Sequence, residues 1–149
     1  MSGSGLWKKL ETLAPDQSVP LQQALDEIPW NADGLIPAIA QQYDTKEVLM
    51  LAWMNKEALR ETLAKGRVCY WSRSRQQLWR KGESSGQVQQ LHEARFDCDG
   101  DTLLLLVDQT GPACHTGRRD CFYNLVQGDS LVVDKPVLID PETLYGKQS

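Results

Sequence analysis

Residues 91–109 read LHEARFDCDGDTLLLLVDQ, and this stretch carries the strongest fold signal in the chain. It predicts two strands, Leu91–Asp97 and Thr102–Gln109, on either side of an Asp-Gly pair, which is typical of a hairpin turn. The run Leu103–Val107 is apolar at every position, which indicates a strand that is buried on both faces. The stretch therefore predicts a sheet with this strand inside the core.

Further strand-like segments lie on both sides of this hairpin. They are short, rich in apolar residues, and separated by turn signals such as Asp33-Gly34. The predicted strands are Leu35–Tyr43, Glu47–Trp53, Arg67–Ser72, Cys121–Val126 and Ser130–Lys135. We expect the last of them to close the sheet.

Helices are predicted at Leu6–Leu13, at Leu21–Ile28, and from Asn55 to about Lys65. In the third helix Asn55 is a suitable N-cap, and Gly66 stands where a helix C-terminus favours glycine. The predicted buried stripe of that helix consists of Ala58, Leu59, Thr62 and Leu63. The predicted fold class is α+β and mainly β, with a few flanking helices.

The composition is that of an ordinary globular domain, with 149 residues, 41% hydrophobic and 24% charged. The net charge of -4 argues against nucleic acid as the main partner, because nucleic-acid-binding surfaces are usually basic. No apolar run approaches the roughly 18 residues of a membrane span, and no signal peptide is recognised. We therefore expect a cytoplasmic protein without a membrane partner.

Three of the four cysteines have the spacing Cys98-x15-Cys114-x6-Cys121. Three thiolates that leave the fourth position open are typical of catalytic zinc, whereas three unrelated buried thiols are the alternative. His115 is either a fourth ligand or an acid–base group. The fourth cysteine, Cys69, lies in a strand-like apolar run and is predicted to be a core thiol.

Carboxylates alternate with other residues in Asp97-Cys98-Asp99-Gly100-Asp101. In an extended chain Asp97, Asp99 and Asp101 would share one face, where their charges favour a hard divalent ion such as magnesium. A solvated hairpin turn is the alternative. An EF-hand does not fit, because its glycine belongs at the sixth loop position.

Residues 73–90 have no clear period and are predicted to form a long irregular loop, a kind of segment that is usually functional or disordered. Arginine forks, hydroxyls and tryptophan in and just before this loop suit a phosphate and a stacked base, while a solvated loop is the alternative. The candidate substrate-binding residues are Trp71, Ser72, Arg73, Ser74, Arg75, Lys81 and Ser85. Arg118 and Arg119 could form a second phosphate clamp.

Taken together, these segments resemble the phosphoribosyl-AMP cyclohydrolase family of histidine biosynthesis, over roughly Trp30 to Asn124. Each motif alone is moderately specific, but their order and spacing together are highly specific. The motifs are NADGLIPA at residues 31–38, AWMN at 52–55, WSRSR at 71–75, LWRKGESSG at 78–86, DCDGD at 97–101 and CHTG at 114–117.

The resemblance implies zinc bound through Cys98, Cys114 and Cys121, and magnesium bound by the three aspartates of the acidic motif. It also implies a compact, strongly twisted, barrel-like sheet and an intertwined homodimer whose zinc ligands come from both subunits. The implied division is an N-terminal arm at residues 1–29, a cyclohydrolase domain at 30–135 and a C-terminal tail at 136–149.

The implied reaction is the third step of histidine biosynthesis, in which water opens the purine ring of phosphoribosyl-AMP between N1 and C6. Zinc would activate the attacking water. His115 is the candidate for moving the proton, and Glu83 is a second acid–base candidate or a ribose contact. A non-enzymatic zinc module and a nucleotide deaminase are the competing classes, although the H-x-E…P-C-x-x-C motif of zinc deaminases is absent.

Overall fold

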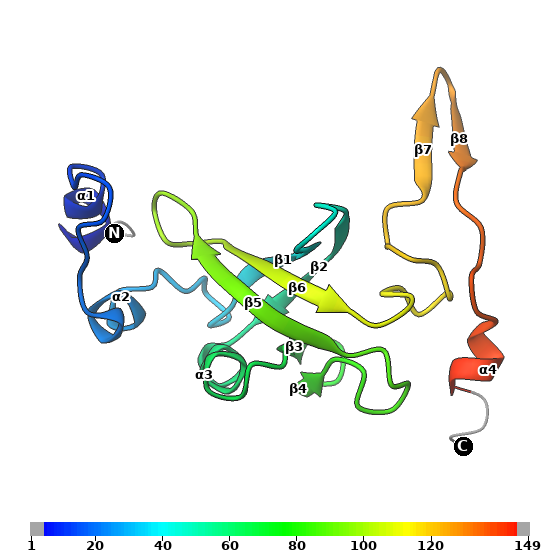
Figure 1. Cartoon of the computed structure of the whole chain (residues 1–149), viewed down its shortest axis with the longest axis horizontal. Helices are drawn as coiled ribbons and strands as arrows, with labels where there is room; N and C mark the ends of the chain where they lie inside the picture. The colour runs from blue at the N-terminus through cyan, green and yellow to red at the C-terminus, as the bar shows by residue number, and fades with distance from the viewer. Residues whose placement is uncertain (1–4, 146–149) are drawn as a thin grey trace.

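The computed structural model describes residues 5–145 and is mainly β (Figure 1). Six strands form one curled sheet in the order β4-β3-β2-β1-β6-β5, with antiparallel neighbours except for the parallel pair β1 and β6. These strands are β1 (Ile36–Gln42), β2 (Val48–Met54), β3 (Cys69–Ser72), β4 (Gln77–Arg80), β5 (Gln89–Phe96) and β6 (Leu103–Gln109). The predicted fold class, a mainly β protein with a barrel-like sheet and a few helices, is confirmed.

The sheet curls into a half-barrel because the residues that precede β3 return to the free edge of β5. Arg67 forms an isolated antiparallel bridge with Gln90, and the Val68 amide donates to the Gln89 carbonyl at 3.0 Å. The Leu91 amide donates in turn to the Gly66 carbonyl at 2.7 Å. The backbone before β3 therefore covers the β5 edge.

The prediction that Ser130–Lys135 closes the sheet is wrong. Strands β7 (Asn124–Gln127) and β8 (Ser130–Val133) pair only with each other, in a separate hairpin with all eight residues exposed. The short Gly128-Asp129 connection folds β8 directly back on β7, so local pairing prevails over pairing with the sheet. The hairpin lies with α4 (Pro141–Tyr145) at one end of the molecule, opposite the N-terminal helices (Figure 1).

The prediction of an irregular loop across residues 73–90 is also wrong in its centre, where β4 pairs with β3. This edge strand has no apolar alternation, because its side chains are used in contacts with other elements. Trp79 packs on Tyr70 with ring centroids 5.4 Å apart, and Arg80 donates to Glu61 of the neighbouring helix at 2.7 Å. Such tertiary contacts leave no periodic signal in the sequence.

The central core lies on one face of β6, and the prediction of burial on both faces holds only in part, because on the other face Leu106 is buried but Leu104 is half-buried. Leu103, Leu105 and Val107 are completely buried. Helix α3 (Lys56–Lys65) packs against the sheet through Ala58, Leu59 and Thr62, which belong to the predicted stripe. The Asn55 side chain accepts from the Ala58 amide at 2.8 Å, and Gly66 ends the helix in the left-handed conformation.

The helices of the N-terminal arm are short but belong to the core. Helix α1 (Gly5–Leu10) buries Leu6 and Trp7, while α2 (Leu21–Asp26) buries Ala24. Cys69 is also completely buried, which confirms the predicted core thiol. None of the helices in residues 5–145 is long and apolar enough to span a membrane.

Candidate active site

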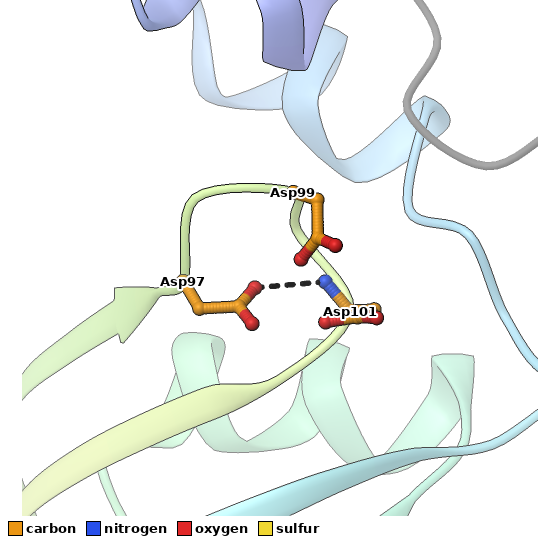
Figure 2. A group of neighbouring side chains, drawn as sticks. All are labelled: Asp97, Asp99 and Asp101. Atoms are coloured by element: carbon orange, nitrogen blue, oxygen red, sulfur yellow. Dashed lines mark hydrogen bonds between the residues drawn. The ribbon is translucent and has the colours of Figure 1, made fainter.

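The three aspartates come together in the turn between β5 and β6 (Figure 2). One carboxylate oxygen from each of Asp97, Asp99 and Asp101 lies within 4.8 Å of the other two. The Asp101 amide donates to Asp97 Oδ1 at 3.0 Å, and the Thr102 amide donates to the same oxygen at 3.3 Å. A hydrogen-bonded turn, rather than an extended chain, therefore gathers the carboxylates.

The three carboxylates of this turn repel one another, so their electrostatics favour a bound cation. Partial burial, followed by the charges and hydrogen bonds of Asp97 and Asp99, raises the pKa of Asp101 to about 6. Burial would also raise the pKa of Asp97, but hydrogen bonds from Asp101, Asp99 and Thr102 bring it below its usual value. A hard divalent ion with oxygen ligands would relieve this repulsion, so the donor set fits magnesium.

Cys114 and Cys121 lie together in the loop that follows β6. Cys114 is buried, and the Cys121 amide anchors the loop by donating to the Leu49 carbonyl at 2.8 Å. Burial, followed by the charge and hydrogen bonding of Cys114, raises the pKa of Cys121 to about 12. Two adjacent sulfurs that repel as thiolates fit a soft cation such as zinc.

Lys81 lies with this cysteine pair and not with the Trp71–Arg75 motif. Its side chain is buried, and Nζ donates to the Ala113 carbonyl at 2.9 Å. Burial lowers the pKa of Lys81, while the neighbouring thiols of Cys121 and Cys114 act in the opposite direction. The positive charge of Lys81 acts to lower the pKa of Cys121, against the larger effects of burial and of Cys114.

Cys98 lies at the other end of β6, exposed within the acidic turn. The seven residues of this strand separate it from Cys114 by roughly 23 Å along the strand direction. Within residues 5–145 the three aspartates are the only group of three or more potential ligands in mutual reach. One chain therefore carries two partial thiol sites at opposite ends of the same strand.

A polar cavity of about 290 Å³ brings Trp71 and Arg73 together with residues that the sequence did not indicate as site residues. Its remaining lining residues are Asp33, Leu35, Asn55 and Gln76. The Arg73 guanidinium lies 4.8 Å from the centre of the Trp53 ring. Asp33 belongs to the NADGLIPA motif and Asn55 to AWMN, so the motifs named both residues without indicating a shared cavity.

This cavity and the acidic turn lie at the same end of the sheet. Asp33 precedes β1 and Asp101 precedes β6, and these parallel neighbours are in register at Ala38 and Leu103. Segments that enter adjacent parallel strands lie at the same sheet edge. The cavity and the three carboxylates therefore share one edge of the sheet, although none of the carboxylates lines the cavity.

The other candidate residues are spread over the turns around these sites. Ser72 Oγ accepts from the Arg75 amide at 3.3 Å in the β3–β4 turn, where Ser74 and Arg75 are exposed. Ser85 Oγ accepts from the Gln87 amide at 3.2 Å. Glu83 is exposed in the turn after Lys81.

His115 is exposed beside Cys114, and its imidazole has no hydrogen-bond partner among residues 5–145. Arg119, a candidate phosphate clamp, instead bonds the Gly111 carbonyl at 2.7 Å and Gln42 Oε1 at 3.1 Å. Arg118 donates to the Lys135 carbonyl at 2.9 Å. Both arginines hold the loop that carries the cysteines in place.

Comparisons with known proteins agree with this arrangement. The family model described as phosphoribosyl-AMP cyclohydrolase matches residues 50–123, a span that includes the acidic turn and the cysteine loop. A relative of that name from Halorhodospira halophila is 68% identical over 136 residues, which cover 91% of this chain and 96% of the relative. The chain belongs to the phosphoribosyl-AMP cyclohydrolase family.

Other members of the phosphoribosyl-AMP cyclohydrolase family are similar over nearly their whole length. The relative from Alkalilimnicola ehrlichii is 67% identical, with 94% of this chain and 99% of the relative covered. The relative from Chromohalobacter salexigens is 63% identical, with 95% and 97% covered. The family predicted from the motifs is confirmed, and the chain is an enzyme of that family, a hydrolase of histidine biosynthesis.

Proposed function

We propose that this cyclohydrolase opens the purine ring of phosphoribosyl-AMP by hydrolysis of the N1–C6 bond, the third step of histidine biosynthesis. The observation that carries the proposal is the pairing of a thiol site with a carboxylate site in a chain of this family. All four cysteines are free thiols, which agrees with a reaction in the reducing cytoplasm.

Cys98, Cys114 and Cys121 would hold zinc, with a fourth position open to solvent. Bound zinc supplies Lewis-acid activation of water at neutral pH. Lys81 keeps positive charge beside Cys114 and Cys121 and fixes the cysteine loop through its bond to the Ala113 carbonyl, 2.9 Å long. Lys81 therefore opposes part of the rise in the pKa of Cys121 that burial and Cys114 cause.

His115 is the proposed proton carrier. Hydrolysis places a hydroxyl group on C6 and a proton on the departing N1, so one side chain can take the proton from water and deliver it to N1. The exposed imidazole next to Cys114 is available for both transfers. Glu83, exposed in the turn after Lys81, is the second acid–base candidate or a contact for a ribose hydroxyl.

The three aspartates would hold magnesium, and the adjacent cavity would hold a ribose phosphate of the substrate. Arg73 and Asp33 both line the cavity, and neither forms an ion pair with another described side chain. A guanidinium suits phosphate, whereas a carboxylate suits ribose hydroxyls. Magnesium commonly binds through carboxylates and substrate phosphate together, which explains why the two sites lie at one sheet edge.

A second copy of the chain would complete the zinc site. In a two-fold dimer the same pair of surfaces meets twice, so the Cys98 end of each chain can meet the Cys114–Cys121 end of the other. The β7–β8 hairpin exposes Val126 at 75% and Leu131 at 66%, and the segment after it exposes Val137 and Leu138. This apolar surface favours a protein partner. We therefore propose a homodimer with two shared active sites.

The decisive test of the function is the ultraviolet spectrum of phosphoribosyl-AMP mixed with zinc-loaded protein and magnesium. We expect conversion to the spectrum of the opened imidazole carboxamide, abolished by a chelator and restored by zinc. Release of ammonia instead would indicate a deaminase, because ring opening releases none. An unchanged spectrum with fully metallated protein would contradict the proposed reaction and favour the non-enzymatic zinc module.

We predict that Asp33→Asn raises the KM for phosphoribosyl-AMP by about tenfold and leaves kcat nearly unchanged, because it weakens a substrate hydrogen bond worth roughly 1–1.5 kcal/mol. Steady-state kinetics measure both constants. Asp16→Asn is the matched control, since Asp16 is also exposed but lies in the N-terminal arm. An unchanged KM in Asp33→Asn would exclude this carboxylate from the substrate site.

A further inference from the structure

Trp7 of the N-terminal arm packs directly on the acidic turn. Gly100, which lies between Asp99 and Asp101, is buried and has φ +75°. A Cβ atom at Gly100 would collide with ring atoms Cδ2, Cε2 and Cζ2 of Trp7. The indole therefore occupies the space that a side chain at this position would need, and the close contact requires glycine.

The indole is itself fixed from two further directions. Its Nε1 donates to the Glu27 carbonyl at 2.8 Å, which ties α1 to the end of α2. Its ring is tilted against Phe96 with centroids 5.4 Å apart, and Phe96 is the residue before Asp97. Trp7, one of five tryptophans in the chain, is only 4% exposed, so these contacts bury almost the whole side chain.

Trp7 therefore contacts the acidic turn at two points, at Phe96 before the first aspartate and at Gly100 between the other two. The remaining support of the turn is local: the Asp97 amide bonds the Thr102 carbonyl at 3.0 Å, and the Gly100 amide bonds the Asp97 carbonyl at 3.2 Å. Three exposed carboxylates in mutual reach tend to push this turn open. A rigid ring against the turn backbone opposes that movement. In Figure 2 the blue helices of the arm lie beside the turn.

We propose that Trp7 is a positioning residue for the acidic turn, holding the backbone of Gly100 so that the three aspartates are arranged for a divalent cation before it binds. Preorganised ligands bind more tightly, because less of the binding free energy is used to order them. The proposal rests on the proposed cation site. It also assigns a role to the N-terminal arm, which lies before residues 50–123, the part of the chain that the family model matches.

The test measures Mn²⁺ binding to the full-length, zinc-loaded chain without substrate, by electron paramagnetic resonance of the free ion. We expect Trp7→Ala to weaken Mn²⁺ binding by roughly tenfold or more, the range seen when a partner of metal ligands is removed. Trp7→Phe, which keeps a ring on Gly100, should retain most of the affinity. Leu6→Ala is the matched control, because Leu6 is a buried neighbour on the same helix at 7% exposed.

A second variant protects the test against misfolding of Trp7→Ala. Gly100→Ala forces the ring and the turn apart in a chain that keeps Trp7, so it should weaken Mn²⁺ binding as well. Gly100→Ala also strains the backbone at φ +75° when the ring is absent, but the two changes share one contact, so the double variant should lose less affinity than the sum of the two single losses. Additive losses would indicate two independent effects and would overturn the proposal.

The outcomes separate this proposal from the cation site on which it rests. Asp99→Asn identifies the site, since it should abolish the tight Mn²⁺ binding of the unaltered chain. Unchanged binding in Trp7→Ala together with its loss in Asp99→Asn would overturn the role of Trp7 alone. An equal loss in Leu6→Ala would also overturn it, by assigning the effect to the whole helix. Absence of Mn²⁺ binding to the unaltered chain would overturn both.

Discussion

Cys114→Ala is expected to remove zinc and to lower the turnover of phosphoribosyl-AMP by more than about a hundredfold. Loss of an outer-shell partner alone lowers metal affinity or activity by roughly 10–100-fold, and Cys114 is a proposed ligand itself. The substitution also leaves Cys121 without its neighbouring sulfur and Lys81 without one of its two thiol neighbours. Zinc content by atomic absorption and the rate of ring opening are the two measurements.

Cys69→Ala is the matched control for this result. Cys69 belongs to β3 and is completely buried. Its backbone amide donates a hydrogen bond to Thr62 Oγ1 of α3 at 2.9 Å. Burial raises the pKa of Cys69 to about 11, and the charged groups that act on this thiol are Glu61 and Arg80 rather than another cysteine. This variant should keep zinc and turnover while losing some stability. Zinc and full activity retained in Cys114→Ala would contradict the proposed ligand set.

Strong local signals in the sequence predicted much of the fold. The apolar run Leu103–Val107 gave the buried strand, and the Asn55 cap with Gly66 gave α3 almost to the residue. Strand β4 was missed because Trp79 and Arg80 are used in tertiary contacts and show no alternation. The β8 strand was assigned to the wrong sheet, since strand propensity does not identify the pairing partner.

For the candidate site, as for the fold, the residue types in the sequence indicated some features, and only the folded structure shows the others. The residue types, together with the family resemblance, indicated thiols and alternating carboxylates as candidate metal ligands, and the structure gathers the carboxylates in one turn. The sequence did not show that Lys81 and Arg73 belong to different sites, because both lie in one basic segment. In the structure Arg73 lines the cavity, whereas Lys81 donates to the Ala113 carbonyl beside the cysteine pair. The sequence also did not predict the contact between Trp7 and Gly100, because that contact depends on how α1 packs against the β5–β6 turn.

A shared zinc site predicts that two inactive variants restore each other. Cys98→Ala and Cys114→Ala should each be inactive alone. In a dimer with one chain of each kind, the Cys98 of one chain meets an intact Cys114–Cys121 pair on the other, while the second site lacks both. Mixed dimers purified through two different tags should therefore show about half of the unaltered activity and zinc content, as two equivalent interfaces require.

The control pair is Cys114→Ala with Cys121→Ala, two lesions in the sulfur pair that one chain brings together. Every site in that mixed dimer contains a damaged pair, whichever chain supplies Cys98, so no activity should return. Recovery in the first pair and none in the second assigns Cys98 to one subunit and the other two ligands to its partner. No recovery in the first pair, with both chains present in the purified dimer, would contradict a shared site. Because Cys98 and Cys114 lie at opposite ends of β6, the chain would then need a rearrangement of that strand to bind zinc alone.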